Sequence, residues 1–283
     1  MKSLKIMKKR EVIKNLIVNL LLIIICFFMI YPVLYTLMTS FKTQNTVLTM
    51  PPTFFPAEWS LEGYKAVLRS AMFKIYLPNT AFNALLASLI IMPISAFAAY
   101  SFSRYAYRWS RTLQLSILGL MMIPGLTNLV AIYRLGSVLN LMNTHLILVL
   151  IYTAGGVPFT IWIMKAFFDA IPKGLEEAAK IDGCTPLMTL WHIVIPLAGP
   201  GLVSGFLLNF VTFWNEFLAA VILLTVNSAR TATVGLYDFQ SQYEIAYHIV
   251  TAACIIIMLP VVITFIFARR SFFKAMMDGA LKG

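Results

Sequence analysis

Long apolar runs alternate with short polar segments along this chain. Six of the runs have the ~20 residues that an α-helix needs to cross a membrane. Their approximate ranges are 15–38, 79–102, 112–133, 145–164, 200–226 and 248–268. The hydropathy pattern therefore predicts an all-α integral membrane protein with six transmembrane helices.

Two of the polar segments are long enough to hold structure of their own. Residues 39–77 are rich in proline, and within them residues 61–73 have the amphipathic pattern of a short surface helix. Residues 227–247 form a second polar loop with several aromatic side chains. Aromatic residues are common wherever a protein meets the membrane interface, so this composition alone does not assign a role to the loop.

Composition and charge give the chain an orientation. Hydrophobic residues make up 60% of the 283 positions, charged residues make up 12%, and the net charge is +11. With the N-terminus inside, the inner segments carry 16 of the 22 Lys and Arg residues and the outer segments carry six. The positive-inside rule then places both termini in the cytoplasm. This distribution explains the basic charge by topology, without nucleic acid as a partner.

The predicted organisation is a basic cytoplasmic N-terminus at 1–14, a six-span transmembrane domain at 15–268 and a cytoplasmic tail at 269–283. The first apolar run is too long for the core of a signal peptide and is expected to be an uncleaved span. The three cysteines, at 26, 184 and 254, are isolated, which predicts neither a disulfide framework nor a metal cluster.

The polar connector at 172–196 predicts two short helices separated by a glycine. Pro172 suits a first helical turn, and Gly183 suits the left-handed conformation that ends a helix. Thr185 and Pro186 are a typical N-cap and first helical residue, which restarts the chain as a helix. Helical spacing places Leu175, Ala178, Ala179 and Asp182 on one side and pairs Glu176 with Lys180. By physics alone this is an amphipathic connector at the membrane surface.

The amino-acid sequence of the connector contains a motif that is more specific than its helical pattern. Glu177-Ala178-Ala179, three residues, Gly183, nine residues and then Ile193-Val194-Ile195-Pro196 resemble the EAA signature of ABC importer permeases. The longer form, from Ile171-Pro172 to Ile181-Asp182-Gly183, is similar to the smaller permease of the maltose-transporter type. Ile195 departs from the leucine usual before the proline, which is a conservative change. The resemblance implies the type I importer fold and a coupling helix that docks on an ATPase subunit.

On this resemblance, one set of residues is expected to couple the chain to its ATPase: Glu176, Glu177, Ala178, Ala179, Asp182, Gly183 and Pro196. The alternative for Glu177 is a surface charge near a helix N-terminus, favourable by only ~0.3–1 kcal/mol. Gly183 also has a conformational role, because a Cβ would resist a positive φ.

A second set of candidate residues lies on the fifth apolar run: Asn209, Thr212, Trp214, Asn215 and Glu216. An ionisable residue inside a span normally faces a helix bundle or a wet cavity. This stripe predicts either a lining of the translocation pathway, where it would meet sugar hydroxyls, or hydrogen bonds that position neighbouring helices. The sequence leaves both open.

The resemblance also implies partners. A binding protein outside the membrane would contact the second polar loop through Tyr237, Phe239, Gln240 and Tyr243. A second homologous permease would complete the pathway, and two ATP-binding subunits would hold ATP and Mg²⁺, leaving this chain with no cofactor of its own. The implied location is the bacterial plasma membrane.

The sequence contains no catalytic motif that would predict an enzyme. The sequence has no phosphate-binding glycine loop followed by Lys and Ser or Thr, no H-E-x-x-H and no paired cysteine ligands, so no catalytic or metal residue is assigned. Two alternatives of other classes remain: an ion- or proton-coupled secondary carrier for a polar solute, and an integral-membrane enzyme. A carrier typically has internal repeats and several buried ionisable groups, and an enzyme would need a catalytic cluster.

Overall fold

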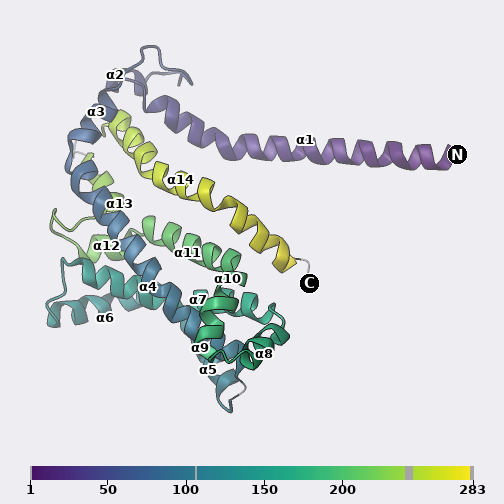
Figure 1. The fold of residues 1–283 in the computed structure, drawn as a ribbon. Helices are drawn as coiled ribbons and strands as arrows, with labels where there is room; N and C mark the ends of the chain where they lie inside the picture. Colours follow the sequence, from purple (N-terminus) through teal and green to yellow (C-terminus); the bar gives the residue numbers. More distant parts are fainter. Residues whose placement is uncertain (1, 106, 240–244, 281–283) are drawn as a thin grey trace. The chain divides into compact units, whose positions relative to one another are not determined.

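The computed structural model describes residues 2–105, 107–239 and 245–280, and every regular element in these ranges is a helix (Figure 1). For residues 2–10, 12, 13, 126 and 271–280, the structure describes the backbone and not the side chains. The all-α prediction is therefore confirmed. The chain divides into two compact units. The first consists of Met1–Leu68 and Asp238–Ile256, and the second consists of Arg69–Tyr237 and Ile257–Gly283.

The first unit contains α1 (Lys2–Thr39), α2 (Gln44–Val47), most of α3 (Glu62–Arg69) and the start of α14 (Tyr247–Ala280). The amphipathic helix expected within 61–73 is present as α3, and its buried residues include Gly63 and Val67. A Cβ at position 63 would lie 2.5 Å from the carbonyl oxygen of His248, so only glycine fits this approach. Helix α3 therefore packs directly on the backbone of α14.

Lys42 is a buried cation in the same unit. Its ammonium donates to the carbonyl of Thr53, and burial lowers the pKa of the Lys42 amine. Since it lies in the loop after α1, it helps to fix that loop.

The second unit holds the remaining elements, except that the last two residues of η3 belong to the first unit. In chain order they are η1 (Met72–Tyr76), α4 (Leu77–Arg104), α5 (Ser110–Met121), α6 (Gly125–Val138), α7 (His145–Asp169), α8 (Lys173–Ile181), α9 (Pro186–Thr189), η2 (Leu190–Val194), α10 (Ile195–Leu197), α11 (Gly199–Trp214), α12 (Leu218–Leu223), α13 (Ala232–Gly235) and η3 (Leu236–Phe239), followed by the rest of α14.

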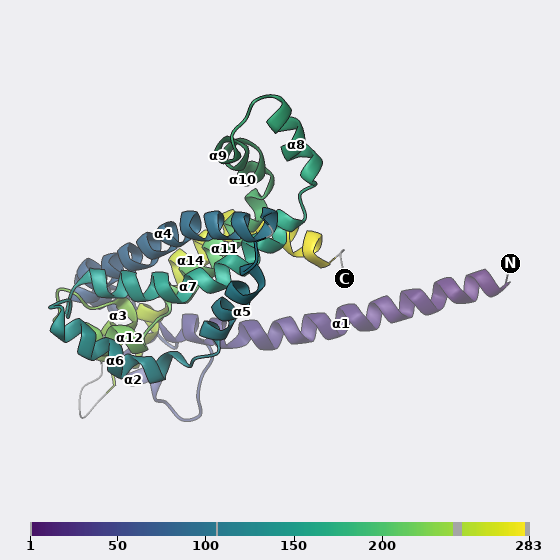
Figure 2. The ribbon, with the colours of Figure 1, turned by 90° about the horizontal axis from the view of Figure 1, so that it is seen from below.

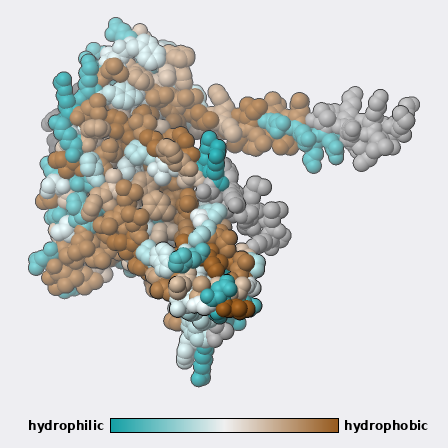
Figure 3. All heavy atoms as spheres, viewed as in Figure 1, coloured by the Kyte–Doolittle hydropathy of each residue, from teal (hydrophilic) through white to brown (hydrophobic). Residues whose placement is uncertain are grey.

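Among the described residues, four helical stretches are long and apolar enough to cross a membrane: Lys14–Thr39, Met72–Arg104, His145–Asp169 and Tyr247–Arg270. A fifth is added if Pro186–Leu197 and Gly199–Trp214, which meet at 78°, count as one broken span. The number is therefore four or five, against the six expected from hydropathy. Hydrophobic residues cover most of the face drawn in Figure 3.

The missing span is the apolar run at 112–133, which does not form one helix. Helix α5 ends at Met121, and α6 begins after Pro124, whose backbone is extended (φ −61°, ψ 126°). A proline has no N–H to donate and disfavours helix in the residue before it, so the run breaks there into two short helices. The run at 200–226 is also divided, between α11, which ends at Trp214, and α12, which begins at Leu218, although no proline lies between them.

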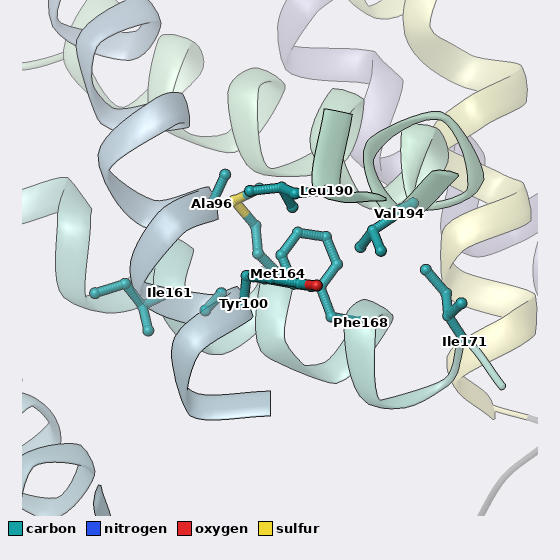
Figure 4. Close-up of a cluster of buried hydrophobic side chains, with 10 residues drawn as sticks. Ala96, Tyr100, Ile161, Met164, Phe168, Ile171, Leu190 and Val194 are labelled. Atoms are coloured by element: carbon teal, nitrogen blue, oxygen red, sulfur yellow. The ribbon is translucent and has the colours of Figure 1, made fainter. Parts of the chain in front are cut away.

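The core of the second unit is the packing of α4 on α7. Small buried residues on α4, among them Ala84, Ala87 and Ala99, let the two helices approach closely. At one end, Tyr100 of α4 and Met164 and Phe168 of α7 form a cluster with Leu190 and Val194 of η2 (Figure 4). This cluster seats the end of the connector on the two long helices.

Candidate functional site

Helix α8 ends in a well-defined glycine cap. The amide of Gly183 donates to the carbonyl of Lys180 at 3.1 Å, and the amide of Cys184 donates to Ala179 at 2.9 Å. These two bonds, with Gly183 at φ +84°, are the Schellman motif that terminates helices. No atom lies near an added Cβ, so the requirement for glycine is conformational. The predicted helix end at Gly183 is confirmed.

The second helix of the connector also begins where the sequence predicts. Thr185 is the N-cap of α9, where its hydroxyl accepts from the Met188 amide, and Pro186 follows at the first helical position. The chain then continues through η2 and α10 into α11. Pro172, expected in the first turn of α8, is instead its N-cap residue, one position outside the helix.

Glu176 faces inward and carries the connector's main polar contacts. Its Oε1 accepts from Nε of Arg104 at 2.5 Å, and its Oε2 accepts from the Tyr100 hydroxyl at 2.9 Å. The Arg104 guanidinium also donates to the carbonyl of Ile171, just before α8, at 3.1 Å. Glu176 is only 6% exposed, so a partner protein on the surface of α8 cannot reach it. This placement argues against Glu176 as a docking residue.

Two expectations for the faces of α8 are therefore corrected. The pair between Glu176 and Lys180 does not form, because both carboxylate oxygens of Glu176 are taken by α4. The inward face consists of Glu176 and Ala179, whereas Leu175, Ala178 and Asp182 point outward. The reason is the ion pair with Arg104, which rotates α8 so that its acid, and not its leucine, meets the bundle.

The outward face of the connector combines two acids, Glu177 and Asp182, with exposed apolar side chains. Glu177, Ala178, Asp182, Gly183 and Pro196 are all exposed. Beside them lie Ile181, which is 88% exposed, and Leu187, which is 55% exposed. Figure 2 shows α8, α9 and α10 standing away from the α4–α7 pair, at the end of α4. We define the outward surface formed by Glu177, Ile181 and Leu187 as the connector face.

The polar residues of α11 do not form one stripe. Asn209 is buried and donates to the Thr160 hydroxyl at 2.7 Å, and Trp214 is buried and donates to the carbonyl of Ile257 at 3.0 Å. Thr212 and Asn215 are exposed on another side and bond to their own helix, at Leu208 and Val211. Asn209 and Trp214 thus hold helices together, while Thr212 and Asn215 lie on a free polar face.

Glu216 caps the next helix. Its Oε1 accepts from the Ala219 amide at 2.7 Å, and its Oε2 accepts from the Ala220 amide at 3.1 Å and from the Tyr152 hydroxyl at 2.9 Å. All three partners are donors, and two of them are amides in the first turn of α12. The geometry favours the helix-positioning alternative for this residue.

Glu216→Ala should destabilise the protein without a specific effect on transport. The change leaves the amides of the buried residues Ala219 and Ala220 without their acceptor, at about 1–3 kcal/mol for each unsatisfied group. Thermal unfolding in detergent measures the loss, and Asn215→Ala, at the exposed neighbour, is the matched control. Unchanged stability together with lost transport would instead identify Glu216 as a pathway residue.

The second polar loop, residues 227–247, is described only in part. Tyr237 is exposed and stacks on Phe217 with 5.5 Å between ring centroids, and Phe239 is half-buried at the end of η3. Gln240 and Tyr243 lie outside the described residues. The expected binding-protein contact therefore stays a prediction at all four positions.

Sequence reasoning missed Tyr100 and Arg104 as site residues. Arg104 counted only among the 16 Lys and Arg residues of the inner segments, and 72 positions separate it from Glu176. No local pattern connects residues so far apart, whereas the close packing of α4 with α7 and η2 does. Among the described residues, no group of three or more His, Cys, Asp or Glu side chains could hold a metal ion.

The chain is similar to a known protein family and to individual proteins over most of its length. The profile of the family described as "Binding-protein-dependent transport system inner membrane component" matches residues 12–277. A putative ABC transporter permease protein, ORF2 of Caldicellulosiruptor sp., is 34% identical, over 89% of this chain and 91% of that one. The trehalose/maltose transport system permease protein MalG of Thermococcus litoralis is 32% identical, over 97% of this chain and 99% of that one.

A solved structure has the same fold. One chain of a bacterial ABC transporter involved in the import of the acidic polysaccharide alginate superposes with a TM-score of 0.80. The match covers 92% of this chain and 96% of that chain, at 22% sequence identity. This superposition shows the fold, and the family profile with the two relatives above 30% identity confirms the resemblance of the sequence to importer permeases.

Proposed function

Because the chain belongs to the family of binding-protein-dependent transport system inner membrane components, we propose that it is one permease subunit of an ATP-driven sugar importer. It forms half of a translocation pathway with a second, homologous permease. The sugar class is supported by relatives such as the trehalose/maltose permease, which is similar over nearly its whole length. The proposed location is the bacterial plasma membrane, with both chain termini on the cytoplasmic side.

The connector face is the observation that carries the coupling role. An exposed isoleucine and a carboxylate on α8, with an exposed leucine on α9, suit a groove on a soluble partner, because both short helices stand away from the α4–α7 pair. The positive-inside distribution of Lys and Arg assigns this face to the cytoplasm, where ATP is available. Two ATP-binding subunits supply hydrolysis, with ATP and Mg²⁺ in their own sites, and one of them docks here.

The free polar face of α11 is the best candidate for a pathway lining. Thr212, near the end of α11, and Asn215, its C-cap residue, present exposed hydroxyl and amide groups, and such groups can exchange hydrogen bonds with a sugar. On the outside, the loop that contains Tyr237 receives the sugar-binding protein, since exposed aromatic rings stack readily on sugar rings and on protein surfaces.

Glu177→Ala tests the docking role. We expect attachment of the ATPase, measured by co-purification from membranes, to weaken about tenfold, because a charged contact at the interface is lost. Lys180→Ala is the matched control, since Lys180 is exposed on the same helix but outside the connector face. The alternative carrier function predicts that the chain alone moves solute down an ion gradient, with no ATPase present and no effect of Glu177→Ala.

A further inference from the structure

The inner end of α4 holds the connector by a buried ion pair. Arg104 is the last residue of α4, and the side chains of Arg104 and Glu176 are 7% and 8% exposed. Tyr100, one turn earlier, donates to the second carboxylate oxygen. A buried pair of this kind is costly to break, because the remaining charge is left without a partner. Helix α8 is therefore fixed to α4 more firmly than helix packing alone would fix it.

The outer end of α4 holds a second segment in a similar way. The Asn79 amide donates to the carbonyls of Ser228 and Arg230, each at 2.9 Å. The buried hydroxyl of Thr80 accepts from the amide of Ala232, at the start of α13, at 2.8 Å. Both residues lie in the first turn of α4, so the loop before α13 is tied to the helix end opposite Arg104.

Between these two ends, α4 is one continuous helix. Residues 79 to 104 span about 38 Å at the ~1.5 Å rise per residue of an α-helix. The helix continues through Pro93 and packs along α7 with small buried residues, which leaves little freedom to bend independently. Displacement of one end is therefore transmitted to the other.

We propose that Arg104, Tyr100 and Glu176 are positioning residues that make α4 the mechanical link between the connector and the outer loop at 228–232. The inference rests on the proposed function. Glu177 and its neighbours bind the ATPase, whereas Glu176 converts movement of α8 into movement of α4. Docking and coupling are thus divided between two adjacent glutamates on opposite faces of one helix.

Because docking and coupling are assigned to different residues, a variant of the ion pair should lower stimulation of ATP hydrolysis without lowering attachment of the ATPase. In the double variant Arg104→Met with Glu176→Leu, apolar side chains of similar size replace the ion pair, which preserves packing. We expect ATPase co-purification to stay within about twofold of wild type, while the stimulation of ATP hydrolysis by binding protein falls roughly tenfold, a typical size for allosteric coupling. Glu176→Gln retains an acceptor for Arg104 and should keep at least half of the stimulation.

A variant at the outer end of α4 tests the same link without any change to the buried pair of Arg104 and Glu176. Asn79→Ala removes two hydrogen bonds at the outer end and should also reduce stimulation without loss of attachment. Lys165→Gln, which breaks the more exposed Lys165–Asp169 pair on neighbouring α7, is the matched control and should behave as wild type. The same loss from both ends of α4 is the signature of a link, as opposed to a local contact.

Three outcomes would overturn the inference. If the variants keep the wild-type stimulation ratio, α4 is not the link. If hydrolysis falls only in proportion to attachment, Glu176 acts in docking. If wild-type protein neither binds the ATPase nor responds to binding protein, the proposed function fails as well, and the wild-type sample alone identifies that case.

Discussion

Ile181→Lys is expected to abolish stable attachment of the ATPase. Ile181 is the last residue of α8 and is 88% exposed, so it is available to fill a pocket on a partner. Loss of a central apolar anchor typically costs 2 kcal/mol or more, which corresponds to roughly 30-fold weaker binding. A lysine in the last turn of a helix is favourable for the helix itself, so α8 should stay folded. Co-purification and a binding titration in detergent measure the effect.

Leu139→Lys is the matched control for this change. Leu139 is 62% exposed at the end of α6, and the substitution introduces the same charge at a similarly exposed apolar position away from the connector. It should leave attachment at the wild-type level. Wild-type affinity in the Ile181 variant would show that the partner, if present, docks elsewhere.

Trp214→Ala is expected to cause the largest loss of stability. Trp214 is 2% exposed at the end of α11, packs on Phe210 with 5.3 Å between ring centroids, and donates to the carbonyl of Ile257 in α14. Truncation removes the contact that joins these two helices and leaves a cavity, at about 3–5 kcal/mol. The midpoint of thermal unfolding in detergent reports the change.

Two further variants separate the causes. Trp214→Phe keeps most of the volume and removes the indole donor, so about 1 kcal/mol should be lost. Trp109→Ala removes the same side chain from a site that is 62% exposed and should have little effect. Equal losses at positions 109 and 214 would contradict a core role for Trp214.

The connector was predictable because its determinants are local. Gly183, Thr185 and Pro186 each act within a few residues through backbone geometry, and the structure confirms the helix end and the N-cap. The direction in which α8 faces was not predictable. The spacing grouped Leu175 and Ala179 on one side of α8 without saying which side meets the bundle. An ion pair with Arg104, remote in sequence, decides the orientation.

The span count shows the same contrast. Hydropathy located the runs that become α1, α4, α7 and α14, where one long helix satisfies every backbone group. It did not detect that Pro124 divides one run and that the chain bends by 78° before α11. Average apolarity over a window does not register such breaks, because they depend on single residues and on neighbouring helices.

The free polar face of α11 has a consequence for a subunit that has not yet assembled with a partner. Thr212 and Asn215 stand on the outside of this subunit, each with a hydrogen bond only to its own helix backbone. In a subunit synthesised alone, that face would meet lipid, where polar groups are unfavourable. On the proposed function, a second permease covers this face, and we expect a subunit made without it to be degraded faster than the assembled one.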